Sequence, residues 1–160
     1  MKAPHRGAFI VYSMADFRKL AVWQKAHAMS LEADEVAHGI RGVQYSHLRS
    51  QLARSAASVP SNIVEGRAQF SEREFARYLR TAIASASETE YHVITARDKG
   101  VISAARCDRL NEKVVEVRKM LYGLVDRLTG SIATEERPPA PRKKRAKKSP
   151  PKRRKPKDSP

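Results

Sequence analysis

The sequence SEREFARYLRTAIASASETEYHVITARDKG, residues 71–100, decides the fold. Its apolar and small residues recur at alternating spacings of four and three, an average of about 3.5 that is typical of helices packed in a left-handed bundle. Ser71 and Glu74 have the spacing of a capping box, in which each side chain bonds the backbone amide of the other. The pattern predicts a helix that begins at Ser71 and that Gly100 ends. Its stripe consists of Phe75, Leu79, Ala82, Ala86, Thr89, Val93 and Ala96.

Two neighbouring segments carry comparable stripes and are also predicted as helices. Residues 46–66 contain Leu48, Leu52, Ala56, Val59 and Ile63. A segment that starts near Ser103 or Ala104, and that Gly130 is expected to close, contains Leu110, Val114, Val117, Leu121, Leu124 and Leu128. Pro60 lies inside the first of these helices, where it removes the hydrogen bond to the Ala56 carbonyl and should kink the helix.

A further helix is predicted at the start of this region, from Asp16 or Lys19 to Ala37. Gly39 and Gly42 are expected to stop it. Its apolar face is expected to contain Leu20, Trp23, Ala26 or His27, and Leu31.

The predicted connections are short, about seven, about four and two or three residues. Short connections force consecutive helices to lie antiparallel. The predicted fold class is therefore all-α, an antiparallel up-down-up-down four-helix bundle over residues 16–130. Residues 1–15 are expected to form a disordered N-terminal arm, in which Met14 is the true or an alternative start. Residues 131–160 are expected to form a disordered tail rich in Lys, Arg and Pro.

The charge of the chain is concentrated in this tail. The 160 residues contain 32 Lys and Arg against 17 Asp and Glu, a formal charge of +15. From Arg137 onward, twelve basic residues and one acid give +11, which leaves +4 for residues 1–136. An unstructured polycation suits a polyanion, because the release of counterions provides affinity without a fixed geometry. A solubilising tail or a targeting signal are the competing interpretations. The tail residues predicted to bind nucleic acid are Arg142, Lys143, Lys144, Arg145, Lys147, Lys148, Lys152, Arg153, Arg154 and Lys155.

A second group of cations lies on the helix that begins at Ser71. Arg73, Arg77 and Arg80 fall on the side opposite its apolar stripe, and Arg67 comes just before it. Guanidinium groups one helical turn apart can each contact a backbone phosphate, so these residues are predicted to form a basic ridge that binds nucleic acid. The alternative is a solvated face whose arginines pair with acids such as Glu74.

Several classes of site are not expected. The single Cys107 excludes a disulfide framework and a cysteine-based zinc site, and no histidine lies near it in the sequence. His27, His38, His47 and His92 show no i, i+4 pairing with acids arranged as ligands, so no metal site or cofactor is expected. Nucleotide-binding glycine loops and hydrolase motifs are missing from the sequence. No apolar run approaches the roughly 20 residues needed to span a bilayer, so a cytoplasmic location is expected.

Three segments together resemble a known family. They are DFRKLAVWQKAH (residues 16–27), QLARSAASVPSNIVEG (residues 51–66) and EFARYLRTAIASASETE (residues 74–90). Over roughly residues 16–129 the chain resembles the bacterial 23S rRNA intervening-sequence proteins, a group of four-helix bundles that includes the accessory variability determinant of diversity-generating retroelements. The resemblance implies a ring-like homopentamer that binds RNA, or a nucleic-acid enzyme such as a reverse transcriptase, and implies no catalysis.

The remaining motif residues are expected to have structural roles. Trp23 is assigned to core or interface packing, and Gly66 ends the second motif segment.

Asn62 is expected to donate hydrogen bonds near Pro60, with a nucleotide pocket as the alternative. Glu65 is expected to accept a hydrogen bond from an arginine such as Arg54 or Arg67. Glu88 and Glu90 point about 200° apart on their helix and cannot act as one acid–base pair. The resemblance implies that these acids form structural or intersubunit ion pairs.

The sequence thus predicts a non-catalytic, oligomeric nucleic-acid-binding protein, with RNA favoured over DNA. It is expected in the bacterial cytoplasm, associated with the ribosome or the nucleoid. One alternative is a protein-interaction scaffold whose tail only steers or solubilises. The other is a metal-dependent nuclease or hydrolase that uses Glu65, Glu88 or Glu90. Val22, Tyr78, Ile83, Tyr91 and Tyr122 are expected to supply subunit contacts, because they lie beside or off the apolar stripes.

Overall fold

The computed structural model describes the backbone of residues 16–135 and the side chains of residues 16–130. The expected arm and almost all of the expected tail therefore lie outside the described residues. The described part consists of four α-helices, with a short 3-10 turn before each of the first two and no strand. The helices are α1 (Ala21–Gly39), α2 (Ser46–Arg67), α3 (Glu72–Asp98) and α4 (Ala104–Glu135), and the turns are η2 (Phe17–Lys19) and η3 (Val43–Tyr45).

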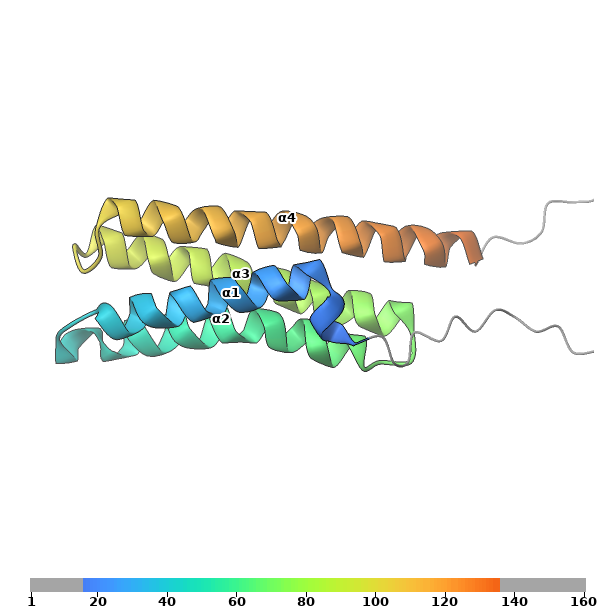
Figure 1. Ribbon diagram of the computed structural model, residues 1–160, viewed down its shortest axis with the longest axis horizontal. Coiled ribbons are helices and arrows are strands. Elements are labelled where there is room, and N and C mark those ends of the chain that lie inside the picture. Colours follow the sequence, from blue (N-terminus) through green and yellow to red (C-terminus); the bar gives the residue numbers. More distant parts are fainter. Residues whose placement is uncertain (1–15, 136–160) are drawn as a thin grey trace, which may run out of the picture.

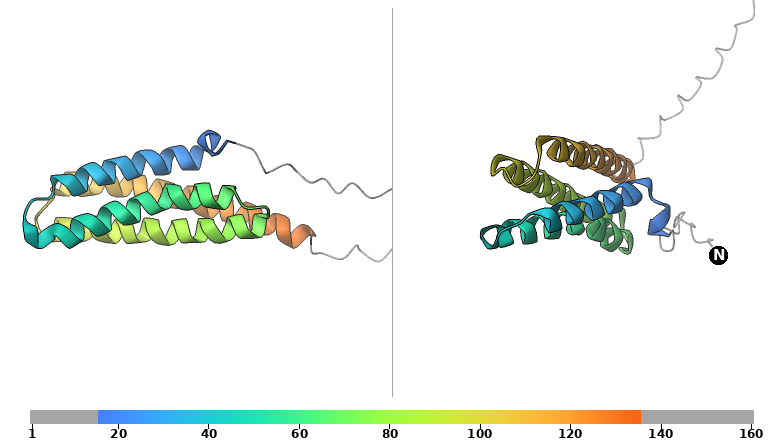
Figure 2. Two further views of the ribbon diagram at one scale, coloured as in Figure 1. Left: turned by 90° about the horizontal axis from the view of Figure 1, so that it is seen from below. Right: turned by 60° about the vertical axis from the view of Figure 1, so that its left-hand side comes forward.

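The four helices form the predicted antiparallel bundle. Figure 1 shows α1 to α4 running alternately along the long axis, with the α1–α2 and α3–α4 connections at one end and the α2–α3 connection at the other. We call the second end the tail end, because the first and the last described residues, 16 and 135, also lie there. The left view of Figure 2 shows α4 reaching past the other helices at this end.

The core confirms most of the predicted stripes. Every predicted stripe residue of α2 and α3 is buried. In α4 the prediction holds with one shift, since Leu124 is half-buried and Val125 is buried next to it. None of the described helices is long and apolar enough to span a membrane.

The predicted apolar face of α1 is right only in part: Ala26, one of its two alternatives, is fully buried, and Leu20 is half-buried against the core. Leu31 is 55% exposed, His27 is exposed, and Trp23 is only half-buried. The buried face repeats at spacings of four and three and shares only Ala26 with the predicted one. The buried face consists of Val22, Ala26, Met29, Ala33 and Val36.

The predicted end of α4 is also wrong. The helix continues through Gly130 to Glu135. A glycine inside a helix costs only about 1 kcal/mol relative to alanine, which does not by itself end a helix. Gly100 does end α3, because it adopts a positive φ of 69°. Its amide bonds the carbonyl of Arg97 and the next amide, of Val101, bonds that of Ala96, the two bonds of a Schellman motif.

Candidate nucleic-acid interface

The predicted ridge lies on the part of α3 nearest the tail end. Arg73, Arg77 and Arg80 are all exposed. Arg77 is not available as a free cation, because its Nε donates to Glu74 Oε2 at 3.0 Å and its guanidinium lies 4.7 Å from the centre of the Tyr78 ring. Among the described residues, Arg80 has neither an ion pair nor a side-chain hydrogen bond. The structure thus supports the paired alternative for Arg77 and an open cation at Arg80.

Ser71 caps α3 as predicted, by one of the two expected bonds. Its Oγ accepts from the Glu74 amide at 3.2 Å. The Glu74 carboxylate does not return the bond to Ser71, because it is held by Arg77. The capping box is therefore half-formed, and the Glu74 carboxylate pairs with Arg77 of the ridge instead.

The turn between α2 and α3 carries an aromatic residue that the sequence analysis missed. Phe70 is 97% exposed, the largest exposure of any large hydrophobic residue described. It lies between Arg67, which ends α2, and Arg73. Arg67 is half-buried, with its guanidinium 5.9 Å from the centre of the Phe75 ring. An apolar residue in a predicted polar turn was the available signal.

A third arginine at this end is also placed on an aromatic ring. Asp16 caps η2 by accepting from the Arg18 amide, and the Arg18 guanidinium lies 4.9 Å from the centre of the Phe17 ring. The turn η2 packs against α2, as Figure 1 shows for the first described residues. The tail end therefore gathers several arginine–aromatic contacts, and the tail residues predicted to bind nucleic acid, which follow α4, lie outside the described residues.

Pro60 is accommodated inside α2, which runs through it without a break. Side chains after the proline bond the carbonyls before it: Asn62 Nδ2 donates to the Ser58 carbonyl at 2.8 Å, and Ser61 Oγ to that of Ala57 at 3.0 Å. Asn62 donates near Pro60 as expected, but its acceptor is the Ser58 carbonyl and not the Ala56 carbonyl, which is the one that the proline leaves without its amide partner. Asn62 also bonds Ser58 Oγ, which leaves its amide nitrogen committed within α2.

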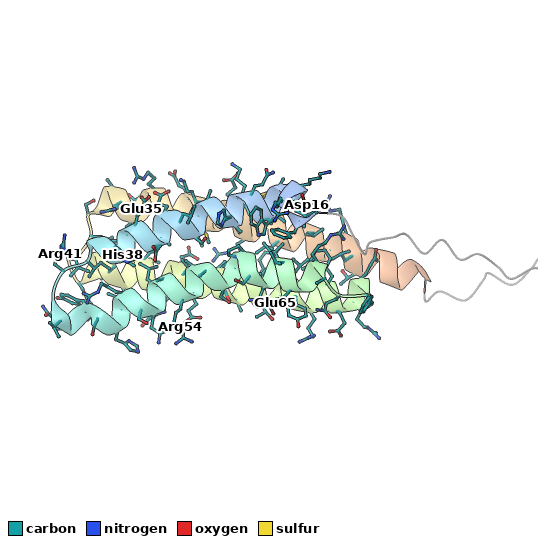
Figure 3. All side chains as sticks on the ribbon, turned by 60° about the horizontal axis from the view of Figure 1, so that its bottom comes forward. Asp16, Glu35, His38, Arg41, Arg54 and Glu65 are labelled. Carbon is teal, nitrogen blue, oxygen red and sulfur yellow. The ribbon has the colours of Figure 1, made fainter. Side chains whose placement is uncertain are left out.

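The predicted acceptor role of Glu65 is not seen with Arg54. Glu65 and Arg54 are both exposed and lie well apart along α2 (Figure 3). Eleven residues of helix separate them by about 16 Å, beyond the reach of an ion pair. Gly66, in contrast, lies in close contact with α3. A Cβ at this position would lie 2.7 Å from Tyr78 Cβ and 2.9 Å from a ring carbon of Phe75.

Glu90 makes the ion pair expected of it, with Arg118 of α4. Glu88 lies 3.4 Å from His92 on its own helix. Glu32 of α1, not singled out in the sequence, pairs with two cations of α4: it binds Lys113 and, at 2.8 Å, Arg109. These contacts fix the alignment of α4 against α1 and α3.

The histidine prediction needs correction. His38 and His92 each contact an acid four residues earlier, Asp34 and Glu88 respectively. Within the described residues, no group of three His, Cys, Asp or Glu side chains could hold a metal ion. Cys107 is buried in the core, and burial raises the pKa of its thiol.

The predicted subunit contacts divide into two groups. Val22 and Ile83 are buried in the core of a single chain, so their assignment to an interface is wrong. Tyr91 and Tyr122 are 64% and 53% exposed, and Tyr78 is half-buried beside Gly66. Trp23 stacks on His27, with ring centres 5.0 Å apart, and packs against the edge of the core.

Comparison with known proteins assigns the family. The family model described as the 23S rRNA-intervening sequence protein matches residues 18–123, about two thirds of the chain. The chain belongs to this family. The match includes the ridge, Phe70 and the Pro60 segment and stops before Gly130, so the basic tail is an addition to the part that defines intervening-sequence proteins.

A solved structure shows the same fold. It is the crystal structure of a protein with unknown function from the S23 ribosomal protein family of Bacteroides thetaiotaomicron, with a TM-score of 0.62 and 23% sequence identity. The match covers 66% of this chain and 98% of that one. No curated protein matches the chain. The chain therefore shares the fold of its bundle with the Bacteroides protein.

Proposed function

We propose that this intervening-sequence protein is a non-catalytic, self-associating nucleic-acid-binding protein, with RNA as its ligand in the bacterial cytoplasm. The observation that carries the proposal is the position of the ridge. Arg73, Arg77 and Arg80 lie near the start of α3. Figure 1 shows that α3 begins at the end of the bundle where α4 ends, and the sequence with twelve cations follows α4. A polyanion held by the tail would therefore be close to the ridge. A ribosome- or nucleoid-associated location is part of the same proposal.

Repetition of the ridge in an assembly would strengthen binding. A closed homopentamer of full-length chains would carry +75, five times the +15 of one chain. Leu31, Tyr91 and Tyr122 leave apolar surface that a second copy could cover. Several weak ridges on one particle raise the overall affinity, because the second contact is made at a high effective concentration.

The proposal is tested by nucleic-acid binding of the full-length protein and of a variant without residues 137–160. A variant with Arg73, Arg77 and Arg80 changed to Gln tests the ridge separately. Binding that survives loss of the tail and falls on loss of the ridge supports a role for both. No binding by any of these proteins would contradict the proposal.

A protein-interaction scaffold is the second candidate. A shallow apolar groove favours it, formed where the start of α1 passes α4 and lined by Leu20, Met120 and Leu124 among others. The pairing of Arg77 with Glu74 also weakens the ridge as a phosphate site. In that case the protein would bind a partner such as a reverse transcriptase through the bundle, and removal of the ridge would leave partner binding unchanged.

The metal-dependent nuclease alternative has the least support. Glu65 lies on α2, while Glu88 and Glu90 of α3 are engaged by His92 and Arg118. The nuclease alternative would be supported if the protein cleaved RNA in the presence of Mg²⁺ and lost this activity when these acids were changed to Gln.

A further inference from the structure

We propose that the turn at the tail end binds unpaired nucleobases, with Phe70 as the stacking platform. This inference rests on the proposed nucleic-acid function and names its ligand class as single-stranded rather than duplex RNA. It starts from the position of Phe70, whose side chain is 97% exposed between the last residue of α2 and the first turn of α3.

The outward position of Phe70 is held by its neighbours. On the α2 side, the Gln69 amide donates to the Gly66 carbonyl at 3.1 Å and Gln69 Nε2 to the Glu65 carbonyl at 2.9 Å. On the α3 side, Ser71 accepts two hydrogen bonds: its Oγ accepts from the Glu74 amide and its carbonyl from the Phe75 amide. Because both flanking residues are fixed by hydrogen bonds, Phe70 is presented on a structured turn, and little order has to be gained when a base stacks on it.

The sequence around Phe70 has the residue types of a single-strand site. Arg67 and Arg73 come three residues before and three residues after it in the chain, and Arg80 lies further along α3. Cations beside an exposed aromatic ring are the combination that proteins use for unpaired strands, in which arginines meet phosphates and the ring stacks on a base. A base inside a duplex has both faces covered by its neighbours, so it cannot stack on Phe70 without being extruded.

The arginine–aromatic contacts at this end also favour the binding of a single strand. Arg67 lies on the Phe75 ring, Arg77 on Tyr78 and Arg18 on Phe17. A guanidinium that lies on a ring has fewer conformations to lose when it meets a ligand, and its plane can itself stack on a base.

The test is a binding assay with the full-length protein, a labelled 12-nucleotide oligouridine and a blunt RNA duplex of equal length. Fluorescence anisotropy is measured at 50 and 200 mM salt. Phe70→Ala should weaken binding of the single strand by roughly 5- to 150-fold, as stacking on one ring predicts, and leave duplex binding within about twofold. The fold-loss should be similar at both salt concentrations, because stacking does not release counterions whereas the contacts of the tail do.

Two further variants make the test specific. Phe70→Trp should retain single-strand binding, because its ring also stacks. Val43→Ala is the matched control, because Val43 is 87% exposed in the connection at the opposite end of the bundle. This substitution should leave both affinities unchanged. A single-stranded DNA of the same length tests whether the site distinguishes the sugar.

Three results would overturn the inference. Equal losses for single strand and duplex would make Phe70 a general contact. Unchanged affinity together with a smaller assembly in light scattering would make it a subunit contact. Binding of neither RNA by the unaltered protein would contradict the proposed function as well, which separates that failure from a failure of Phe70 alone.

Discussion

Gly66 of α2 lies directly against Tyr78 of α3, so close that a Cβ on the glycine would be 2.7 Å from the tyrosine Cβ. The backbone of Gly66 is not in the left-handed region, so the glycine is required here by the space between two helices and not by its φ angle. This contact holds the end of α2 against the first turns of α3, directly beneath the turn that carries Phe70.

Gly66→Ala should therefore destabilise the bundle. The added methyl meets a backbone-anchored Cβ and the Phe75 ring, and overpacking of this kind costs about 1–3 kcal/mol, more than the gain of up to about 1 kcal/mol from helix propensity. Urea unfolding measures the change. Gly123→Ala is the matched control, because no atom lies within 4 Å of a Cβ there and α4 should gain stability. Equal effects of the two substitutions would refute the packing argument.

Pro60→Ala should preserve the helix content, since α2 is already continuous through residue 60. The substitution restores the hydrogen bond to Ala56, worth about 1 kcal/mol, and removes part of a buried ring. It should straighten α2 and shift the turn to α3. A large loss of helix signal in circular dichroism would contradict this.

The bundle should lose stability in acid through Glu32. The hydrogen bond from Lys113, followed by the charge of Lys113 and the contacts of Arg109, lowers the pKa of Glu32 below its ordinary 4.5, against the effect of burial. A lowered pKa in the folded state gives stability that is complete above about pH 5 and is lost as the pH falls through the folded value. Glu32→Gln should thus be less stable at pH 7, by on the order of 1 kcal/mol because both cations are partly exposed. The difference in the free energy of unfolding between the two proteins, measured with urea, should shrink below pH 4. A difference that stays constant across that range would contradict the role of the Glu32 charge.

Binding through the tail should depend steeply on salt. If six to ten of the twelve cations of residues 137–160 contact phosphates, the affinity for nucleic acid should fall roughly 10³- to 10⁵-fold between 50 and 200 mM salt. Removal of residues 137–160 should flatten the slope of log affinity against log salt. The same slope with and without the tail would show that the tail does not take part.

Self-association is expected from the exposed Leu31, Tyr91 and Tyr122. Light scattering should give the mass of a homopentamer at micromolar concentration, with and without the tail. Tyr91→Asp and Tyr122→Asp should reduce that mass without unfolding a chain, since neither side chain belongs to the core. A monomer under all conditions would contradict the prediction.

The helices could be predicted where the largest apolar residues coincide with the core. Leu79 and Leu121 fall on such faces, and their burial follows from spacing alone. In α1 the largest apolar residues and the core do not coincide: Trp23 and Leu31 lie on one face, while the core takes Met29 and Ala33 on another. The choice between two apolar stripes is made by the neighbouring helices, and a single sequence does not contain that information.

The candidate site could be predicted only in part. The spacing of the arginines in α3 predicts a common face, and that face exists. Whether an arginine is open depends on which acid reaches it, as Glu74 reaches Arg77. Phe70 was missed because spacing rules describe helices, and the exposure of a turn residue is set by the caps on both sides of it.

The location of both described termini at one end of the bundle has a mechanical consequence. A force applied between residue 16 and residue 135 would separate α1 from α4 one helical turn after another, beginning at that end. The alternative, sliding whole helices past each other, would load all their contacts at once. Contacts between α1 and α4 are the sparsest of the neighbouring helix pairs, so they would open first. A tether placed on residues 16 and 135 should therefore unfold the bundle at a lower force than one placed across it, from the tail end to the opposite end.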